Sequence, residues 1–173
     1  MKIVVISGSP RKQAVTQVMM KFVHDYTKSK NAETKFINLS DGMVDCYKGY
    51  DVTYSDTTTQ AAKDIMDADV WLIGTPIYNS FFSAALKNLF EYVNYKSTAG
   101  KTAGLAILAS GTIGFTDVQT LLTQLMSYFK VITNPKVVFM TVEQIKDGTI
   151  EEASKVKLRE LVDETILLAS RPK

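Results

Sequence analysis

Short apolar runs alternate along the chain with segments in which apolar residues recur every three to four positions. The first run, residues 2–8, is rich in β-branched residues and ends in Gly, Ser and Pro, which is typical of a buried strand followed by a turn. In residues 15–26 the apolar side chains follow the spacing of one face of an amphipathic helix. The same two patterns recur to the end of the chain, so we predict that strands alternate with helices.

Five strands and five helices follow from these patterns. The expected strands are residues 2–8, 34–39, 70–74, 103–109 and 137–142, and the expected helices are residues 15–26, 58–68, 82–93, 118–129 and 150–169. Continuous apolar strands separated by amphipathic helices form a parallel sheet, because right-handed crossovers lay helices on both of its faces. We therefore predict an α/β protein with a doubly wound, three-layer α/β/α sandwich, folded as a single domain over residues 1–173.

The composition is that of a globular protein, since 46% of the 173 residues are hydrophobic and 22% are charged. The net charge of +2 is spread over both halves of the chain, so the basic face of a nucleic-acid-binding protein is not expected. The longest apolar runs have about five to seven residues, against the ~20 of a membrane-spanning helix, and the N-terminus shows no signal-peptide cleavage pattern. We expect a soluble, cytoplasmic protein with no membrane or nucleic-acid partner.

Metal and thiol chemistry have little support in the sequence. The chain has one cysteine, Cys46, and one histidine. An intramolecular disulfide is therefore excluded, and a zinc site built from cysteine and histidine is implausible. A single thiol also cannot supply the four ligands that an iron–sulfur cluster usually needs. We expect no metal site.

Ligands of doubly wound sheets bind outside the carboxyl ends of the strands, so the segments that follow the strands are the candidate site. The first of them, SGSPRKQAVT at residues 7–16, leads into a helix N-terminus with free N–H groups and a positive dipole. Ser9 and Thr16 add hydroxyls, and Arg11 adds a guanidinium. Two well-known phosphate loops are absent, because the segment lacks both Gly-Lys-Ser/Thr and the three-glycine dinucleotide pattern. We predict a phosphate cradle; the alternative is a helix start at Ser9 with a solvated Arg11.

The second candidate segment, TPIYNS at residues 75–80, is expected to form the turn before the helix at residues 82–93. Pro76 stiffens such a turn, Tyr78 offers a flat face and a hydroxyl, and Asn79 can both donate and accept hydrogen bonds. These groups suit a planar ligand. In the alternative reading Tyr78 covers the sheet edge and Asn79 caps the helix.

The third candidate segment, SGTIG at residues 110–114, holds two glycines, Gly111 and Gly114, that permit close approach of the backbone to a ligand. Ser110 and Thr112 lie beside them. Together the three segments describe one ligand, because the first suits a phosphate and the other two suit the edge of a flat ring. A mononucleotide of that shape is FMN.

The stretches GSPRKQAVT, ADVWLIGTPIYNSFFSAALKNLFEYV and AILASGTIGF, in that order and spacing, resemble the NAD(P)H-dependent FMN reductase family of flavodoxin-like proteins. The resemblance covers roughly residues 2–130. It implies a flavodoxin-like sheet of five parallel strands in the order 2-1-3-4-5, FMN as cofactor and NAD(P)H as reductant. It also implies a small-molecule electron acceptor, such as free flavin, a quinone, an azo dye or a metal oxyanion.

The resemblance further implies which residues contact the flavin. The phosphate would be held by Ser9, Arg11 and Thr16; the phosphate, ribityl chain and ring would meet Pro76, Ile77, Tyr78 and Asn79; and the isoalloxazine edge would meet Ser110, Gly111, Thr112 and Gly114. No catalytic side chain is implied, because the flavin N5 atom carries the chemistry. One departure weakens the cradle: many relatives have Ser at the position of Ala14 and often Gly at that of Gln13, so one hydroxyl donor is missing.

The partner expectations come from the same resemblance. Family members form homodimers or homotetramers through the helices that follow the third and fourth strands, and some serve a flavin-dependent monooxygenase. In this chain we expect Phe81 and Tyr92 to widen the apolar face of the helix at residues 82–93, which favours a second copy as partner. Tyr47, Tyr50 and Tyr54 lie in a long loop at residues 40–56 and either cap an apolar edge or meet a partner subunit.

Two other functions stay open at this stage. A flavodoxin-type electron carrier would share the fold and the cofactor, although such carriers are usually strongly acidic and this chain has a net charge of +2. A flavin-free nucleotide-binding scaffold would keep the loops only as structure. Binding of FMN and oxidation of NAD(P)H distinguish the three.

Overall fold

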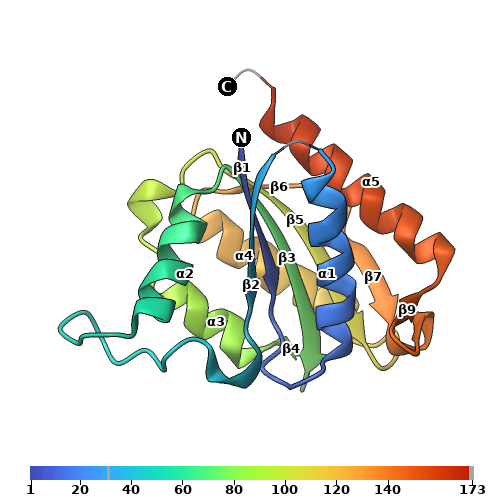
Figure 1. The fold of residues 1–173 in the computed structure, drawn as a ribbon, viewed down its shortest axis with the longest axis horizontal. Helices are drawn as coiled ribbons and strands as arrows, with labels where there is room; N and C mark the ends of the chain where they lie inside the picture. The colour runs from blue at the N-terminus through green and yellow to red at the C-terminus, as the bar shows by residue number, and fades with distance from the viewer. Residues whose placement is uncertain (31, 172–173) are drawn as a thin grey trace.

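Strands and helices alternate in the computed structural model, which describes residues 1–30 and 32–171 (Figure 1). The strands of the main sheet are β1 (Lys2–Ser7), β2 (Glu33–Asn38), β3 (Val70–Tyr78), β4 (Phe81–Phe82), β5 (Thr102–Ala109), β6 (Ile132–Thr133) and β7 (Val138–Thr141). The helices are α1 (Val15–Lys28), α2 (Asp56–Asp67), α3 (Ala84–Glu91), α4 (Phe115–Tyr128) and α5 (Glu152–Ala169). A small antiparallel ribbon joins β8 (Ile145–Lys146) to β9 (Thr149–Ile150). The predicted alternation is confirmed, with shifted boundaries.

The main sheet has the order β2-β1-β3-β5, and both β6 and β7 pair with the outer side of β5. All of these pairs are parallel; β6 pairs with the start of β5, and β7 pairs with its end. Pro135 lies between β6 and β7, and a proline has no N–H to donate to a sheet ladder. The strand predicted at residues 137–142 is β7, and β6 is a further short strand that was not predicted. With β7 as the fifth strand, the predicted order 2-1-3-4-5 is confirmed.

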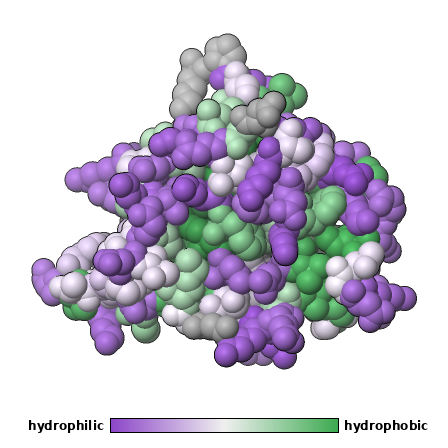
Figure 2. Space-filling model, viewed as in Figure 1, coloured by the Kyte–Doolittle hydropathy of each residue, from purple (hydrophilic) through white to green (hydrophobic). Residues whose placement is uncertain are grey.

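The sheet separates two hydrophobic clusters. One cluster surrounds Trp71 and includes residues of α2, α3 and α4, and the other includes residues of α1 and α5. Figure 1 shows α2 and α3 on one side of the sheet and α1 and α5 on the other. Because both faces of the central strands are buried, these strands appear in the sequence as continuous apolar runs. In the face shown in Figure 2 hydrophilic side chains cover most of the surface, as amphipathic helices require.

The end of β3 differs from the prediction. The strand continues past Gly74 to Tyr78, because its last two residues pair antiparallel with β4. The connection is Asn79–Ser80, two residues with φ of 50° and 65°, which suits a tight hairpin turn with left-handed backbone. The expected turn at Pro76–Tyr78 is therefore wrong, and of the predicted ligand-binding residues in this segment only Asn79 lies in the turn.

Four helices begin two or three residues away from the predicted start, and for α3 and α4 the structure shows the reason. α3 starts at Ala84 instead of residue 82, and the Ser83 hydroxyl accepts a hydrogen bond from the N–H of Leu86 at 3.1 Å. Ser83 therefore caps this helix, and the alternative role of Asn79 as its cap is wrong. α4 starts earlier than expected, at Phe115, directly after Gly114. The φ of Gly114 is 85°, a left-handed conformation that favours glycine.

Neither a membrane span nor a metal cluster is found among the described residues. No helix in this part of the chain combines the length and the apolar character needed to cross a membrane. No group of three or more His, Cys, Asp or Glu side chains within residues 1–30 and 32–171 could hold a metal ion.

Candidate functional site

The chain just after β1 lies in direct contact with the middle of β3, which brings the first two predicted segments together. The N–H of Gly8 donates a hydrogen bond to the carbonyl oxygen of Gly74 at 2.8 Å. A Cβ atom on Gly8 would lie 2.7 Å from that same oxygen, closer than real Cβ atoms come to a carbonyl. Glycine at position 8 is therefore what lets the loop at residues 9–14 leave the sheet beside β3.

A cavity of about 430 Å³ lies between this loop and the ends of β3 and β5. This volume falls within the ~300–1,000 Å³ that is usual for small-molecule sites. Seven of the predicted contact residues line it: Ser9, Arg11, Thr16, Pro76, Ile77, Tyr78 and Ser110. The structure thus gathers most of the predicted site at one edge of the sheet.

The loop has the features of an anion cradle. α1 starts after Ala14, which makes no side-chain cap, and its first turn holds no acidic residue. The first N–H groups of the helix therefore have no side-chain acceptor of the usual capping kind, and the positive end of its dipole faces the cavity. Gln13 has a φ of 51°, the left-handed conformation found in backbone nests that bind anions. Arg11 is exposed on the cavity wall. These groups fit a phosphate.

Ser9 ties the first segment to the second. Its side chain is 1% exposed, its hydroxyl lies 3.0 Å from the hydroxyl of Tyr78, and it accepts from the N–H of Arg11 at 3.3 Å. The Ser9 hydroxyl is therefore engaged within the protein as well as lining the cavity. Thr16 is also buried and lines the cavity. Ser7, at the end of β1, has a buried hydroxyl with no hydrogen-bond partner among the described residues.

The third segment contributes less to this cavity than expected. Ser110 lies on its wall, whereas Gly111, Thr112 and Gly114 do not. Gly111 and Thr112 are exposed, and a Cβ on Gly111 would meet no atom within 4 Å. Gly114 packs near Ile77, whose side chain would lie 3.7 Å from an added Cβ. A contact between Gly111, Thr112 or Gly114 and a ligand requires a ligand that extends beyond the 430 Å³ cavity.

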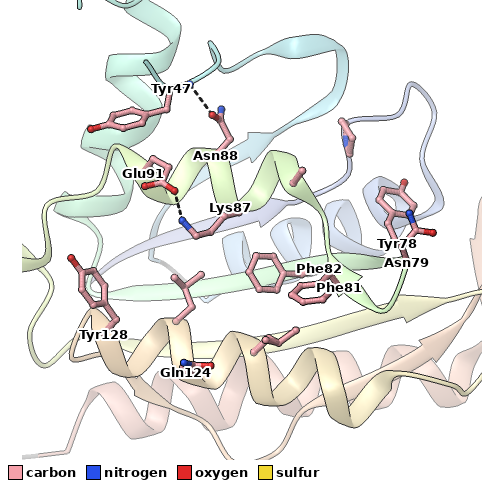
Figure 3. Close-up of a pocket in the computed structure, with 14 residues that line it drawn as sticks. Tyr47, Tyr78, Asn79, Phe81, Phe82, Lys87, Asn88, Glu91, Gln124 and Tyr128 are labelled. Carbon is pink, nitrogen blue, oxygen red and sulfur yellow. Dashed lines mark hydrogen bonds and ion pairs between the residues drawn. The ribbon is translucent and has the colours of Figure 1, made fainter. Parts of the chain in front are cut away.

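A larger cavity of about 930 Å³ adjoins the first, because Tyr78 lies on the wall of both. Figure 3 shows Phe81 and Phe82 between α3 and α4, with Gln124 and Tyr128 on α4 across from Lys87 and Glu91 on α3. Asn79 and Tyr47 also line it. Three of the four residues of α3 on this wall are polar, and two of them, Lys87 and Glu91, form an ion pair. Of these lining residues the sequence had indicated only Tyr78 and Asn79 as ligand contacts.

The matching helical spacing of the lining residues was the signal for this second cavity. On α3 they are Ala84, Lys87, Asn88 and Glu91, and on α4 they are Leu121, Gln124, Leu125 and Tyr128. Both sets follow i, i+3, i+4, i+7, one face of a helix. When two neighbouring helices each have a partly apolar face and no other element covers these faces, a groove lies between them.

The family model described as NADPH-dependent FMN reductase matches residues 1–145. The chain belongs to the NADPH-dependent FMN reductase family. Membership confirms the predicted activity, an NAD(P)H-dependent flavin reductase that uses FMN.

Individual relatives agree with this membership. The NADPH azoreductase of Bacillus sp. (strain OY1-2) is 28% identical over 167 residues, which are 95% of this chain and 90% of the relative. Among solved structures, an apo NADH:FMN oxidoreductase superposes with a TM-score of 0.83 at 20% identity, covering 99% of this chain and 91% of that one. A WrbA-like flavodoxin of Agrobacterium tumefaciens gives a TM-score of 0.71 at 16% identity, covering 99% of both chains. The two structures confirm the flavodoxin-like fold predicted for this FMN reductase family member.

Proposed function

We propose that this flavin reductase binds FMN at the carboxyl edge of its sheet and passes electrons from NAD(P)H to a small-molecule acceptor. The observation that carries the proposal is the 430 Å³ cavity at the start of α1, where uncapped helix N–H groups, a left-handed Gln13 and the Arg11 guanidinium converge. We also propose that residues 1–173 act as one FMN-binding domain, since both hydrophobic clusters pack on the same sheet.

The phosphate end of FMN is assigned to the first loop. Arg11 supplies a positive charge and a fork of donors, and Thr16 supplies a hydroxyl on the first turn of α1. Ser9 holds the loop against Tyr78 and lines the cavity. Because Ala14 offers no hydroxyl, the phosphate has one donor fewer than in many relatives, which favours weaker retention of the cofactor.

The ring end is assigned to the second and third segments. Pro76, Ile77 and Tyr78 are held in place by the pairing of β3 with β4 and β5, so this wall is rigid. The proposed contacts on this side of the site are Pro76, Ile77, Tyr78, Asn79, Ser110, Gly111, Thr112 and Gly114. When bound, FMN supplies hydride and electron transfer, so no side chain is assigned an acid or base role.

A titration with FMN tests this proposal first. The purified protein is expected to quench the fluorescence of added FMN and then to oxidise NADH or NADPH steadily when a quinone or free flavin is present. The cavity residues provide the binding groups that this result requires. A protein that leaves FMN fluorescence unchanged would contradict the assignment and favour the flavin-free scaffold. Binding without oxidation of NAD(P)H would favour the electron carrier.

Several finer assignments rest on the same proposal. Weak retention of FMN suits an enzyme that exchanges reduced flavin, so a flavin-dependent monooxygenase is proposed as one recipient. A cytoplasmic location is proposed because Cys46 is unpaired and NAD(P)H is the reductant. The monooxygenase proposal fails if FMN does not bind.

A homodimer or homotetramer is proposed through α3 and α4, as the resemblance implied, but not because Phe81 and Tyr92 widen the apolar face of α3. Phe81 belongs to β4 and not to the helix, and Tyr92 packs within its own chain, so neither widens the apolar face of α3. Instead, Phe81 is 57% exposed and Tyr128 is 64% exposed at the groove between α3 and α4. A second copy packed against these two rings would remove them from water and would border the cavity without filling it.

Replacing Tyr128 with glutamate is expected to weaken that association. The wild-type protein should sediment as a dimer or tetramer at micromolar concentration, and the Tyr128→Glu variant should shift towards the monomer, because a carboxylate would be buried in the contact. Leu167→Glu provides the matched control, since Leu167 is 60% exposed on α5, outside the groove. A wild-type protein that sediments as a monomer would contradict the proposed assembly.

A further inference from the structure

The loop between β2 and α2 extends beyond α3 and is tied to that helix by two side chains (Figure 1). Asn88 donates from Nδ2 to the carbonyl oxygen of Asp45 at 2.7 Å and accepts at Oδ1 from the N–H of Tyr47 at 2.9 Å (Figure 3). Four residues further along, the hydroxyl of Tyr92 donates to the same carbonyl of Asp45 at 2.8 Å. Both ends of the Asn88 amide are thereby engaged with the loop, which is fixed to α3 at this point.

The loop is also closed on itself. The Asp45 carboxylate accepts from the N–H and the hydroxyl of Ser55, both at 2.7 Å, and from the hydroxyl of Thr58 at 3.0 Å. These hydrogen bonds hold the pKa of the Asp45 carboxyl below its usual value, and those from Ser55 have the largest effect. The Tyr54 hydroxyl accepts a hydrogen bond from the N–H of residue 48 and donates one to the carbonyl oxygen of residue 49, both at 2.7 Å. The loop conformation is therefore set before any ligand arrives.

Three tyrosine rings pack together where the loop meets α3. The ring centroid of Tyr92 lies 5.2 Å from that of Tyr47 and 4.8 Å from that of Tyr54, and both pairs are near perpendicular. Tyr47 and Tyr54 are nearly parallel at 6.2 Å. Burial, more than any neighbouring group, raises the pKa of both Tyr47 and Tyr92 to about 12, so these rings are uncharged at neutral pH. Tyr47 is the member of this cluster that lines the 930 Å³ cavity.

We propose that Asn88 is a positioning residue that holds Tyr47 as an aromatic wall of this cavity, and that the wall favours uncharged planar aromatic electron acceptors. The proposal rests on the proposed function, because an acceptor needs the flavin site next to the cavity. Tyr78 provides that adjacency, since it lies on the wall of both cavities.

The lining of the cavity decides the class of acceptor. Phe81, Phe82 and Leu125 give it an apolar side suited to a flat ring, and aromatic side chains such as Tyr47 stack on such rings. The charges on the wall balance, because Lys87 is paired with Glu91. An anionic acceptor would find no unpaired cation on this wall and would lose its hydration on entry.

A quinone is a suitable probe of this class. Conversion of 1,4-naphthoquinone to its hydroquinone takes two electrons and two protons. NAD(P)H gives up a hydride, which carries two electrons and one proton, and solvent supplies the second proton. The reductase activity therefore provides every electron and proton that the reaction needs.

Loss of Asn88 is expected to change acceptor binding alone. In the Asn88→Ala variant we expect the KM for 1,4-naphthoquinone to rise about tenfold, because Tyr47 is no longer held on the wall. The KM for ferricyanide, a small acceptor that does not need the cavity, and the Kd for FMN should stay unchanged. Asn94→Ala is the matched control, since it removes a side-chain hydrogen bond to backbone just beyond α3, away from the cavity.

A second variant shows whether Asn88 acts through Tyr47. Tyr47→Ala is expected to raise the KM for naphthoquinone by a similar factor, and the double variant should be no worse than Tyr47→Ala alone. Binding of naphthoquinone to the oxidised protein without NAD(P)H, measured by calorimetry, should weaken in parallel in the two single variants. This readout does not depend on turnover.

The preference for uncharged acceptors has its own test. A sulfonated naphthoquinone should bind the wild-type protein with lower affinity than naphthoquinone does. The Glu91→Gln variant should make the two affinities more alike, because the Lys87 ammonium loses its carboxylate partner and can pair with the sulfonate. Equal binding of the two quinones to the wild type would overturn the preference.

The positioning role is overturned by three results. One is an unchanged KM and unchanged calorimetric binding in Asn88→Ala. Another is an equal rise in the KM for ferricyanide with weaker FMN binding, which would indicate general damage. The third is a change in sedimentation without a change in naphthoquinone binding, which would assign Tyr47 to the contact between copies. If instead the wild type fails to bind FMN, the proposed function fails, and calorimetry with naphthoquinone still tests the wall.

Discussion

Arg11→Ala is expected to weaken FMN binding by roughly 10- to 150-fold, equivalent to ~1.5–3 kcal/mol, the usual contribution of a hydrogen bond to a charged group. Arg11 is the one arginine on the wall of the cavity at the start of α1. The other donors there are neutral hydroxyls and N–H groups, apart from the neighbouring Lys12. Fluorescence titration with FMN at two salt concentrations measures the effect, and the loss should shrink at the higher salt.

Two further variants test whether the loss of FMN affinity is specific to the Arg11 guanidinium. Arg11→Lys keeps the charge but not the fork of donors, so an intermediate affinity is expected. Arg159→Ala removes an arginine that pairs with Glu152 on α5 and should leave FMN affinity unchanged. Equal affinity in Arg11→Ala and the wild-type protein would remove Arg11 from the site.

Gly8→Ala is expected to destabilise the protein by ~1–3 kcal/mol and to weaken FMN binding as well. The added Cβ would lie 2.7 Å from the backbone oxygen of Gly74, which cannot rotate away as a side chain would. Relief requires β1 and β3 to separate where the hydrogen bond from Gly8 to Gly74 joins them. That movement would shift the phosphate loop relative to Tyr78.

Denaturation of the flavin-free protein measures this stability. Trp71 is the single tryptophan and is fully buried, so its fluorescence follows global unfolding. Gly111→Ala is the matched control for stability, because no atom lies within 4 Å of an added Cβ there. Equal unfolding midpoints for Gly8→Ala and the wild type would show that the two strands tolerate the separation.

The layered architecture could be predicted from the sequence because its signals are local. Buried parallel strands have to be apolar on both faces, and the helices that cover them have to be amphipathic, so both patterns appear in consecutive residues. The order of the strands came from the resemblance to a family. Pro135 lies just before the predicted fifth strand, and the short β6 on its other side was not predicted.

The end of β3 could not be predicted in the same way. Pro76 and the two polar residues after Tyr78 predicted a turn. The strand continues instead, because Phe81 and Phe82 fold back and pair with it. Pairing of that kind depends on left-handed φ angles at Asn79–Ser80, which neither residue type requires. The sequence placed these residues at the right edge of the sheet but in the wrong local structure.

Contacts between distant segments account for the remaining differences between the predicted site and the structure. The first loop was identified as an anion site from its residue types, and the cavity at the start of α1 has the groups that this needs. The helical spacing on α3 and α4 carried a signal for the larger cavity, but not for its wall at Tyr47, which contacts Asn88, 41 positions further along the chain. No local pattern encodes such a contact, so the role of the tyrosine-rich loop stayed open between two interpretations.

The hydrogen bond between Ser9 and Tyr78 has a consequence for anyone who wishes to redesign this enzyme. A phosphate loop transplanted from another protein would keep this contact only if it brings a hydroxyl to position 9. Successful chimeras will therefore exchange the two segments together, as one inherited unit.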